Sequence, residues 1–477
     1  MTALTTLRQR ATSTAAAPPV AASATASAAA AKRVLAAAAF GFFLVGLDAM
    51  VVNVALPAIG RSLAGGLAGS QWVIDGYTLA FAALMLSAGA LADRIGAKAA
   101  YGLGLIGFTL ASAACGLAPS LGLLIAARLV QGAAASLMLP ASLALVRQAF
   151  PDPVARNKAI TLWTAAGSSA AAAGPVAGGL ITAAVDWRWI FFLNLPAGAL
   201  ALALLAGTPR SPRAAGASHF DAAGLVTSVV ALAGLTYGFI EGGSKGFGTA
   251  PVLASFGAAA VAAAGFLVAE SRQARPMVPL ALFRSRAMSL TAAAGFAVNA
   301  AFYGVIFTLS LYFQQVGHKS ATVTGLLFAP ITAVVTIVNL TVAARMVTRL
   351  GARLSMTIGL FGTAGAMLAV LAVRSDQPLW LLALLLVPVA FAGAFVVPAL
   401  TIMVMGSVPA DRAGTAAGIV NTSRQVGGAL SVAVIGALVA GGDFVGGMRV
   451  GVIGLAALLV LTAVAVQLLA PGKKTAG

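Results

Sequence analysis

Four ionisable side chains stand inside long apolar stretches of this sequence, where charge is otherwise rare. A charged side chain near the centre of a membrane-spanning helix costs about 2.5–3.5 kcal/mol on insertion scales, so each is a candidate for proton transfer or for binding a charged group. They are, each with its apolar stretch, Asp48 (34–56), Asp75 (71–91), Arg128 (121–146) and Arg424 (413–440).

Asp48 and Arg128 have opposite charges at similar depths. Asp48 lies eight residues before the end of its stretch, about 12 Å along a helix, and Arg128 lies seven residues into its own, about 10 Å. Desolvation favours the neutral carboxyl group and a nearby cation favours the carboxylate, so an environment that alternates between the two can load and release a proton. We take Asp48 as the first candidate for a proton-coupling site, with Arg128 as its partner. A static, purely structural ion pair is the alternative.

The other two charges leave more readings open. Asp75 lies about 6 Å inside the start of its stretch by the helical rise, where it either attracts a cationic substrate or protons or simply sits at a wet interface. Arg424 lies deeper and serves binding, gating or structure. We group both residues as candidates for attracting substrate or cations.

Composition determines the kind of elements that must position these side chains. The 477 residues are 60% hydrophobic and 8% charged, with a mean hydropathy of +1.01. A soluble domain carries about 25% charged residues, so lipid must surround most of this chain. The apolar stretches are about 20 residues long and lack the alternation of membrane barrels, which predicts an all-α membrane protein. Fourteen spans are expected, near 34–56, 71–91, 99–118, 121–146, 159–183, 188–207, 221–241, 250–269, 287–313, 322–344, 354–373, 378–405, 413–440 and 448–470.

The net charge of +18 follows the topology of these spans. With a cytoplasmic N-terminus, 21 basic residues fall on the cytoplasmic side and six on the outer side. This asymmetry fits the positive-inside rule with both termini in the cytoplasm of a cell whose inner membrane holds the protein. The basic charge therefore does not indicate a nucleic-acid partner.

An internal repeat suggests two related halves. LADRIGAK at 91–98 is echoed by MVTRLGAR at 346–353, and LPASLALV at 139–146 by VPALTIMV at 397–404, at nearly the same offset. Repeats of this kind are typical of transporters. We therefore divide the chain into a disordered cytoplasmic tail (1–33), an N-terminal six-helix bundle (34–208), a linker with two extra membrane helices (209–286), a C-terminal six-helix bundle (287–470) and a cytoplasmic tail (471–477).

Two short motifs are suited to close helix packing and tight turns. In GALADRIGAK at 89–98, glycines permit a turn and close approach, and the acid can cap a helix or pair with a base. In GPVAGG at 174–179, small residues and a proline favour close packing and a local bend. Ordinary packing and conformational gating are both open for this set: Gly89, Asp93, Arg94, Gly96, Gly174, Pro175, Gly178 and Gly179.

These motifs resemble those of the major facilitator superfamily. LIAARLVQGAAA at 124–135 looks like its fourth-helix motif, and GPVAGG like its fifth-helix antiporter motif. WVIDGYTL at 72–79, WRWIFFLNLPAG at 187–198 and NTSRQVGGAL at 421–430 are similar to the fourteen-helix drug:proton antiporter branch. The resemblance implies two six-helix bundles plus two inserted helices, alternating access, and proton-driven export of small lipophilic drugs or antibiotics by a monomer.

The sequence departs from that family at a few positions. Met50 replaces a usual threonine, Ala97 a common basic residue and Ala170 a glycine. No acid lies deep in a span of the C-terminal half, which disfavours a strongly dicationic substrate.

Two other functions remain as alternatives. One is a dedicated exporter of a single endogenous metabolite or self-made antibiotic, and the other is a membrane receptor that binds without transporting. With one cysteine, Cys115, and two histidines, His219 and His318, we find no nucleophile–base set and no metal-ligand cluster. We therefore expect no enzyme activity, no metal and no cofactor, with the proton gradient as the energy source.

Overall fold

A computed structural model describes the chain except residues 1–19, 209–210, 212–220, 275, 339–340, 343, 373–376, 409–412 and 471–477. The described part is helical, as the composition predicts. Its elements are α1 (Val20–Ser62), α2 (Gly66–Ile95), α3 (Ala97–Leu117), α4 (Leu121–Ala149), α5 (Pro153–Ala184), α6 (Trp189–Phe192), α7 (Asn194–Ala206), α8 (Ala222–Lys245), α9 (Ala250–Arg272), η1 (Leu280–Arg284), α10 (Arg286–Leu311), η2 (Tyr312–Val316), α11 (Ala321–Val338), α12 (Ala344–Val370), α13 (Leu379–Gly393), α14 (Val396–Ser407), α15 (Ala413–Val439) and α16 (Phe444–Leu469).

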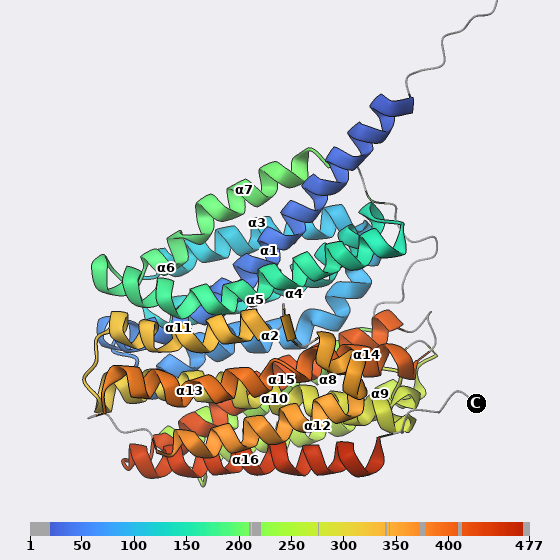
Figure 1. Ribbon diagram of the computed structural model, residues 1–477. Coiled ribbons are helices and arrows are strands. Elements are labelled where there is room, and N and C mark those ends of the chain that lie inside the picture. Colours follow the sequence, from blue (N-terminus) through green and yellow to red (C-terminus); the bar gives the residue numbers. More distant parts are fainter. Residues whose placement is uncertain are drawn as a thin grey trace, which may run out of the picture.

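The helices form two groups that meet along their length. Figure 1 shows α1, α3, α4, α5 and α7 in one group and α10 and α12 to α16 in the other. Contacts between α5 and α11 and between α2 and α15 join the groups. The N-terminal end of α1 and the C-terminal end of α16 lie at the same end of the bundle (Figure 1).

Eleven helices in the described part are long and apolar enough to cross a membrane. The three other expected spans, 159–183, 322–344 and 378–405, coincide with shorter apolar helices at Ala173–Ala184, Ala321–Val335 and Val396–Gly406. Prolines 175, 330 and 388 stand inside these regions, and a proline removes a backbone donor and bends a helix. The number fourteen thus remains a prediction.

The first helix begins earlier than expected. α1 starts at Val20, so residues 20–33 continue the helix where the sequence led us to place a disordered tail. This segment is rich in alanine, the residue with the highest helix propensity, and it extends from a membrane helix that is already formed. Residues 1–19 lie outside the described part.

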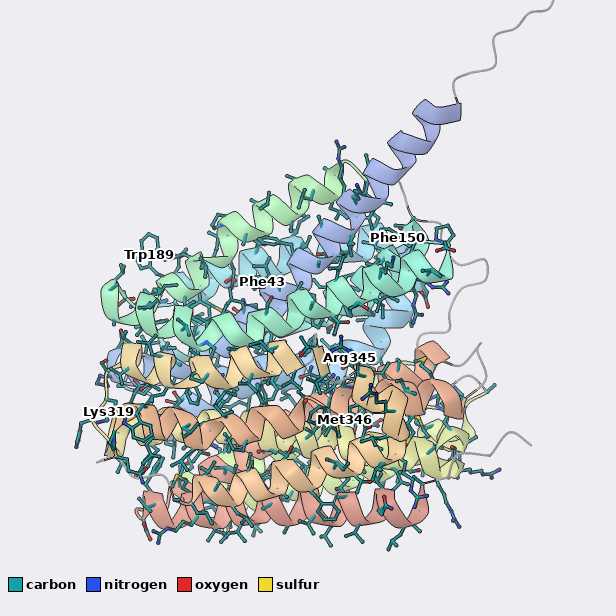
Figure 2. All side chains as sticks on the ribbon, viewed as in Figure 1. Phe43, Phe150, Trp189, Lys319, Arg345 and Met346 are labelled. Carbon is teal, nitrogen blue, oxygen red and sulfur yellow. The ribbon has the colours of Figure 1, made fainter. Side chains whose placement is uncertain are left out.

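Apolar side chains cover much of the exterior. Leu110, Leu117, Val261 and Leu468 are each at least 66% exposed, which suits a surface in contact with lipid. Figure 2 shows Trp189 pointing away from the bundle at the same end as Lys319, while Phe150 lies at the opposite end.

The two extra helices are attached at both of their ends. Trp72 Nε1 in α2 donates to Glu241 Oε1 in α8 at 3.2 Å. At the other end, Asp221 caps α8 and also accepts from Gln273 Nε2 at 2.8 Å and from the Met277 N–H at 3.2 Å. Burial raises the pKa of Asp221, but these donors outweigh burial and the pKa is lowered overall. The linker after α9 is therefore held by an ionised carboxylate.

The internal repeat has the same backbone geometry in both halves. Gly96 has φ +90° and ψ +139° between α2 and α3, and Gly351 has φ +81° and ψ +161° inside α12. Side chains rarely adopt this region, so glycine is needed at both turns. LADRIGAK and MVTRLGAR therefore form the same kind of sharp turn, once in each half.

Replacing Gly351 by alanine should lower stability by about 1–3 kcal/mol, because the turn forces a Cβ into a strained conformation. The matched control is Gly365→Ala in the same helix, which has open space around it and should raise stability by about 0.5–1 kcal/mol. Apparent unfolding temperatures of the purified proteins in detergent test this. Equal temperatures for the two variants would contradict the shared turn.

Candidate functional site

The core of the N-terminal half holds a buried ion pair. Asp48 in α1 and Arg128 in α4 are 0% and 1% exposed, and Arg128 Nη1 lies 2.5 Å from Asp48 Oδ2. The helices do adjoin, as the pairing of the two charges requires. α1 ends at Ser62, beyond the expected 56, so Asp48 lies deeper from that end than predicted.

Two amides complete the shell of the Asp48 carboxylate. Gln131 Nε2 and Asn194 Nδ2 each donate to Asp48 Oδ1 at 2.9 Å. Asn194, in α7, is itself held by Ser112, whose Oγ is 3.0 Å from the Asn194 amide nitrogen. The Asp48 carboxylate therefore accepts one charge-assisted hydrogen bond and two from neutral amides.

Arg128 links this cluster to α2. Its Nε donates to the Val73 carbonyl at 3.0 Å, and its guanidinium lies 4.2 Å from the centroid of the Tyr77 ring. Gln131 Oε1 accepts from Arg128 Nη1 at 2.8 Å. The pair between α1 and α4 is therefore held by two further helices, α2 and α7, and any displacement of α1 relative to α4 must break it.

Asp75 has the opposite surroundings. It is 0% exposed, and neither carboxyl oxygen has a hydrogen-bond partner among the described residues. The wet-interface reading is wrong, because α2 begins at Gly66 rather than 71 and carries Asp75 further into the bundle. A buried carboxylate with no donor is strongly unfavourable, so this environment suits the protonated acid.

Arg424 stands in the C-terminal half, apart from the other three charges. Its Nε and Nη1 donate to the side-chain oxygens of Asn299 and Asn421, each at 3.3 Å. No described acid forms an ion pair with it. The four predicted charges thus fall into one matched pair, one isolated acid and one isolated base.

The GPVAGG segment packs α5 against both halves. A Cβ at Gly178 would lie 2.4 Å from the Val51 carbonyl oxygen in α1, and one at Gly179 would lie 2.4 Å from the Ala321 carbonyl oxygen in α11. A Cβ at Gly174 would lie 2.4 Å from that of Met50, and the Pro175 carbonyl abuts Gly325 of α11. The small residues therefore allow α5 to bridge the two helix groups.

The GALADRIGAK loop is more loosely arranged. Asp93 and Arg94 are exposed, and the side chain of neither bonds to a described residue, so the expected pairing of Asp93 is not observed. Gly89 meets only Pro140, 4.0 Å from an added Cβ. Lys98, which we did not single out, anchors the loop by donating to the Ala206 carbonyl at 3.3 Å and to the Thr208 carbonyl.

Asn194 was also missed as a site residue. In the sequence, Asn194 stands out only as an amide directly before the apolar residues Leu-Pro-Ala-Gly of α7. Its contact with Asp48 becomes visible only in the folded chain. In the described part, no three histidine, cysteine or acidic side chains gather to hold a metal.

Comparison with known proteins identifies this arrangement. The model of the Major Facilitator Superfamily matches residues 38–432. The chain belongs to the major facilitator superfamily. Among its relatives, the multidrug resistance protein Stp of Mycobacterium tuberculosis is 38% identical over 84% of this chain and 74% of its own length. The methylenomycin A resistance protein of Streptomyces coelicolor is 37% identical over 83% of each chain. The tetracenomycin C resistance and export protein of Streptomyces glaucescens is 34% identical over 84% of this chain and 74% of its own length.

Solved structures agree on the fold. The human organic anion transporter MFSD10 (TETRAN) has a TM-score of 0.65 with 19% sequence identity, over 92% of this chain and 99% of that one. The resemblance drawn from the motifs is therefore confirmed: the chain is a transporter-superfamily protein whose relatives are named for drug and antibiotic resistance.

Removing Arg128 alone should be more damaging than removing both charges of the pair. Arg128→Gln leaves the Asp48 carboxylate buried without a counter-charge, which costs about 3–5 kcal/mol. In the double variant Asp48→Asn/Arg128→Gln both groups are neutral and much of the loss should be recovered.

Thermal unfolding in detergent measures the difference. Arg188→Gln is the control, because Arg188 pairs with Asp186 at 3.6 Å on the surface, where an ion pair is worth about 0–1 kcal/mol. A double variant no more stable than Arg128→Gln would refute the ionised pair.

Proposed function

We propose that this protein is a proton-driven antiporter that exports small lipophilic drugs or antibiotics across the cytoplasmic membrane by alternating access. The observation that carries the proposal is the contrast between two fully buried carboxyl groups of the same half. Asp48 is matched by Arg128 and two amides, whereas the carboxyl oxygens of Asp75 have no hydrogen-bond partner in the described part of the chain. One site favours the carboxylate and the other the neutral acid, as transfer of a proton between environments requires.

The contacts between the halves support alternating access. Ser310 Oγ donates to the Asn53 carbonyl at 2.7 Å, and Gln314 Nε2 to the Val54 carbonyl at 3.0 Å. Gln71 Nε2 donates to the Ala433 carbonyl at 3.1 Å. Asn53 and Val54 lie near the Ser62 end of α1, Gln71 lies near the start of α2, and Ala321, which packs against Gly179, begins α11. Figure 1 shows the end of α1 opposite the bundle end that holds the start of α1 and the end of α16, so these contacts lie towards that opposite end. With the termini in the cytoplasm, this end is the outer side, and we assign the conformation to a state closed to the outside.

In this conformation Asp75 carries the proton and Asp48 is locked to Arg128. Opening the outer side separates the helices that surround Asp75 and changes the strain on the α1–α4 pair. Proton entry down an inside-negative potential releases about 2.3 kcal/mol per charge per 100 mV, which is available to drive export. Asp48 keeps its role as first candidate for coupling, and Asp75 joins it as the second proton site.

The names of the relatives suggest the cargo. Methylenomycin A, tetracenomycin C and puromycin occur in the names of resistance proteins that are 33–37% identical to this chain. We propose export of this broad class, and multidrug rather than single-metabolite export. Susceptibility of an overexpressing strain to all three compounds separates the two: protection against only one favours a dedicated exporter.

Replacing Asp75 by asparagine should abolish pH-gradient-driven accumulation of drug while leaving the protein folded. Asparagine keeps the shape of the neutral acid but cannot release a proton. Inside-out vesicles with an imposed pH gradient measure coupled transport, and counterflow of labelled puromycin without a gradient measures substrate exchange.

We expect Asp75→Asn and Asp48→Asn to lose the first activity, with Asp75→Asn keeping the second. Asp443→Asn is the matched control, because Asp443 is exposed, caps α16 and can be replaced by another good capping residue. Full coupled transport by Asp75→Asn would remove it from the proton pathway, and failure of the unaltered protein to respond to the gradient would refute proton-driven antiport.

A further inference from the structure

Arg424 is a cation near the middle of α15 that forms no ion pair with any acid the structure describes. In the described part of the C-terminal half, the only acid is Asp443, which caps the N-terminal end of α16. Arg128 in the other half shows how the fold treats a structural arginine, because it has a carboxylate at 2.5 Å and an amide at 2.8 Å. Arg424 has only two amide oxygens at 3.3 Å, beyond the usual 2.7–3.2 Å of an N–H···O bond.

The guanidinium is positioned but not saturated. Asn299 and Asn421 take Nε and Nη1, and Gly295 makes room for the stem, since a Cβ there would lie 2.9 Å from Arg424 Cγ. Nη2 donates to no described residue. A guanidinium has five N–H donors in a rigid fork, so most of the fork is available to a further acceptor.

The helix that carries Arg424 lies at the junction of the two halves. α15 packs on α10 of its own half and on α2 of the other. Tyr303 of α10 packs against an apolar cluster that contains Val51 of α1 and Val432 of α15. Apolar packing therefore joins both halves next to the helix that carries Arg424.

We propose that Arg424 is the recognition point for an acidic group, a carboxylate or phenolate, on the exported compound. An unmatched guanidinium inside the helix bundle binds such a group strongly, since planar oxygen pairs fit its fork and the charge is otherwise uncompensated. Asn299 and Asn421 supply neutral acceptors that orient the fork without neutralising it. This inference rests on the proposed export function and names the class of compound it favours.

The preference can be measured as binding, separately from transport. Purified protein in detergent is titrated with 1-pyrenebutyrate and with its primary amide, which has the same shape without the charge. We expect the unaltered protein to bind the carboxylate at least about tenfold more tightly, the effect of one charge-assisted hydrogen bond.

Three variants assign this preference to Arg424. Arg424→Gln should bind both probes equally, and Arg424→Lys should keep part of the preference because it keeps the charge. Arg449→Gln is the matched control, because this arginine is exposed on α16, and it should bind as the unaltered protein does. Thermal unfolding of each variant shows that it is folded.

Each outcome decides the proposal. Equal binding of the two probes by the unaltered protein, binding of neither, or a preference that survives in Arg424→Gln would overturn it. Puromycin, which has no carboxyl group, keeps the tests apart, because its gradient-driven accumulation by the unaltered protein tests the antiport without testing the preference for an acidic group. Absence of gradient-driven puromycin transport by the unaltered protein would refute the antiport. The binding preference would still be decided by the titrations with the two probes.

Discussion

The structure depends on how charge is tolerated in a bundle surrounded by lipid. An ionisable group in such a core must be paired with an opposite charge, be neutral, or bind a charged group of a ligand. All three cases occur here: Asp48 with Arg128, Asp75 without a donor, and Arg424 with two amides but no acid. Each case needs a different environment, so the helices around the four charged residues must provide three kinds of surroundings.

Close packing connects α5 to the helix that carries Asp48. Gly178 and Gly179 let α5 touch backbone atoms of α1 in one half and α11 in the other. Since α1 also carries Asp48, α5 is in direct contact with the helix that holds the ion pair. The glycine-rich segment therefore packs on the helix that carries Asp48, although more than a hundred residues of sequence separate Gly178 from Asp48.

The sequence predicted these features to the extent that they depend on local pattern. Apolar length located most spans, depth along a helix paired Asp48 with Arg128, and the repeated loop string anticipated matching turns at Gly96 and Gly351. Features that depend on neighbours in space were not predictable. The burial of Asp75 follows from α2 starting at Gly66, and the role of Asn194 from α7 folding beside α1.

The unmatched arginine also affects the energetics of the proposed exchange. With Asp75 protonated and Arg424 free, the interior carries one excess positive charge on its inward return. With Asp75 ionised and a monoanion on Arg424, it carries one excess negative charge on the outward step. An inside-negative potential favours both movements, so exchange of one proton for one monoanion would release about 4.6 kcal/mol per 100 mV, twice the value for a neutral drug. An acidic cargo is thus the one for which this arrangement of charges gains most from the membrane potential.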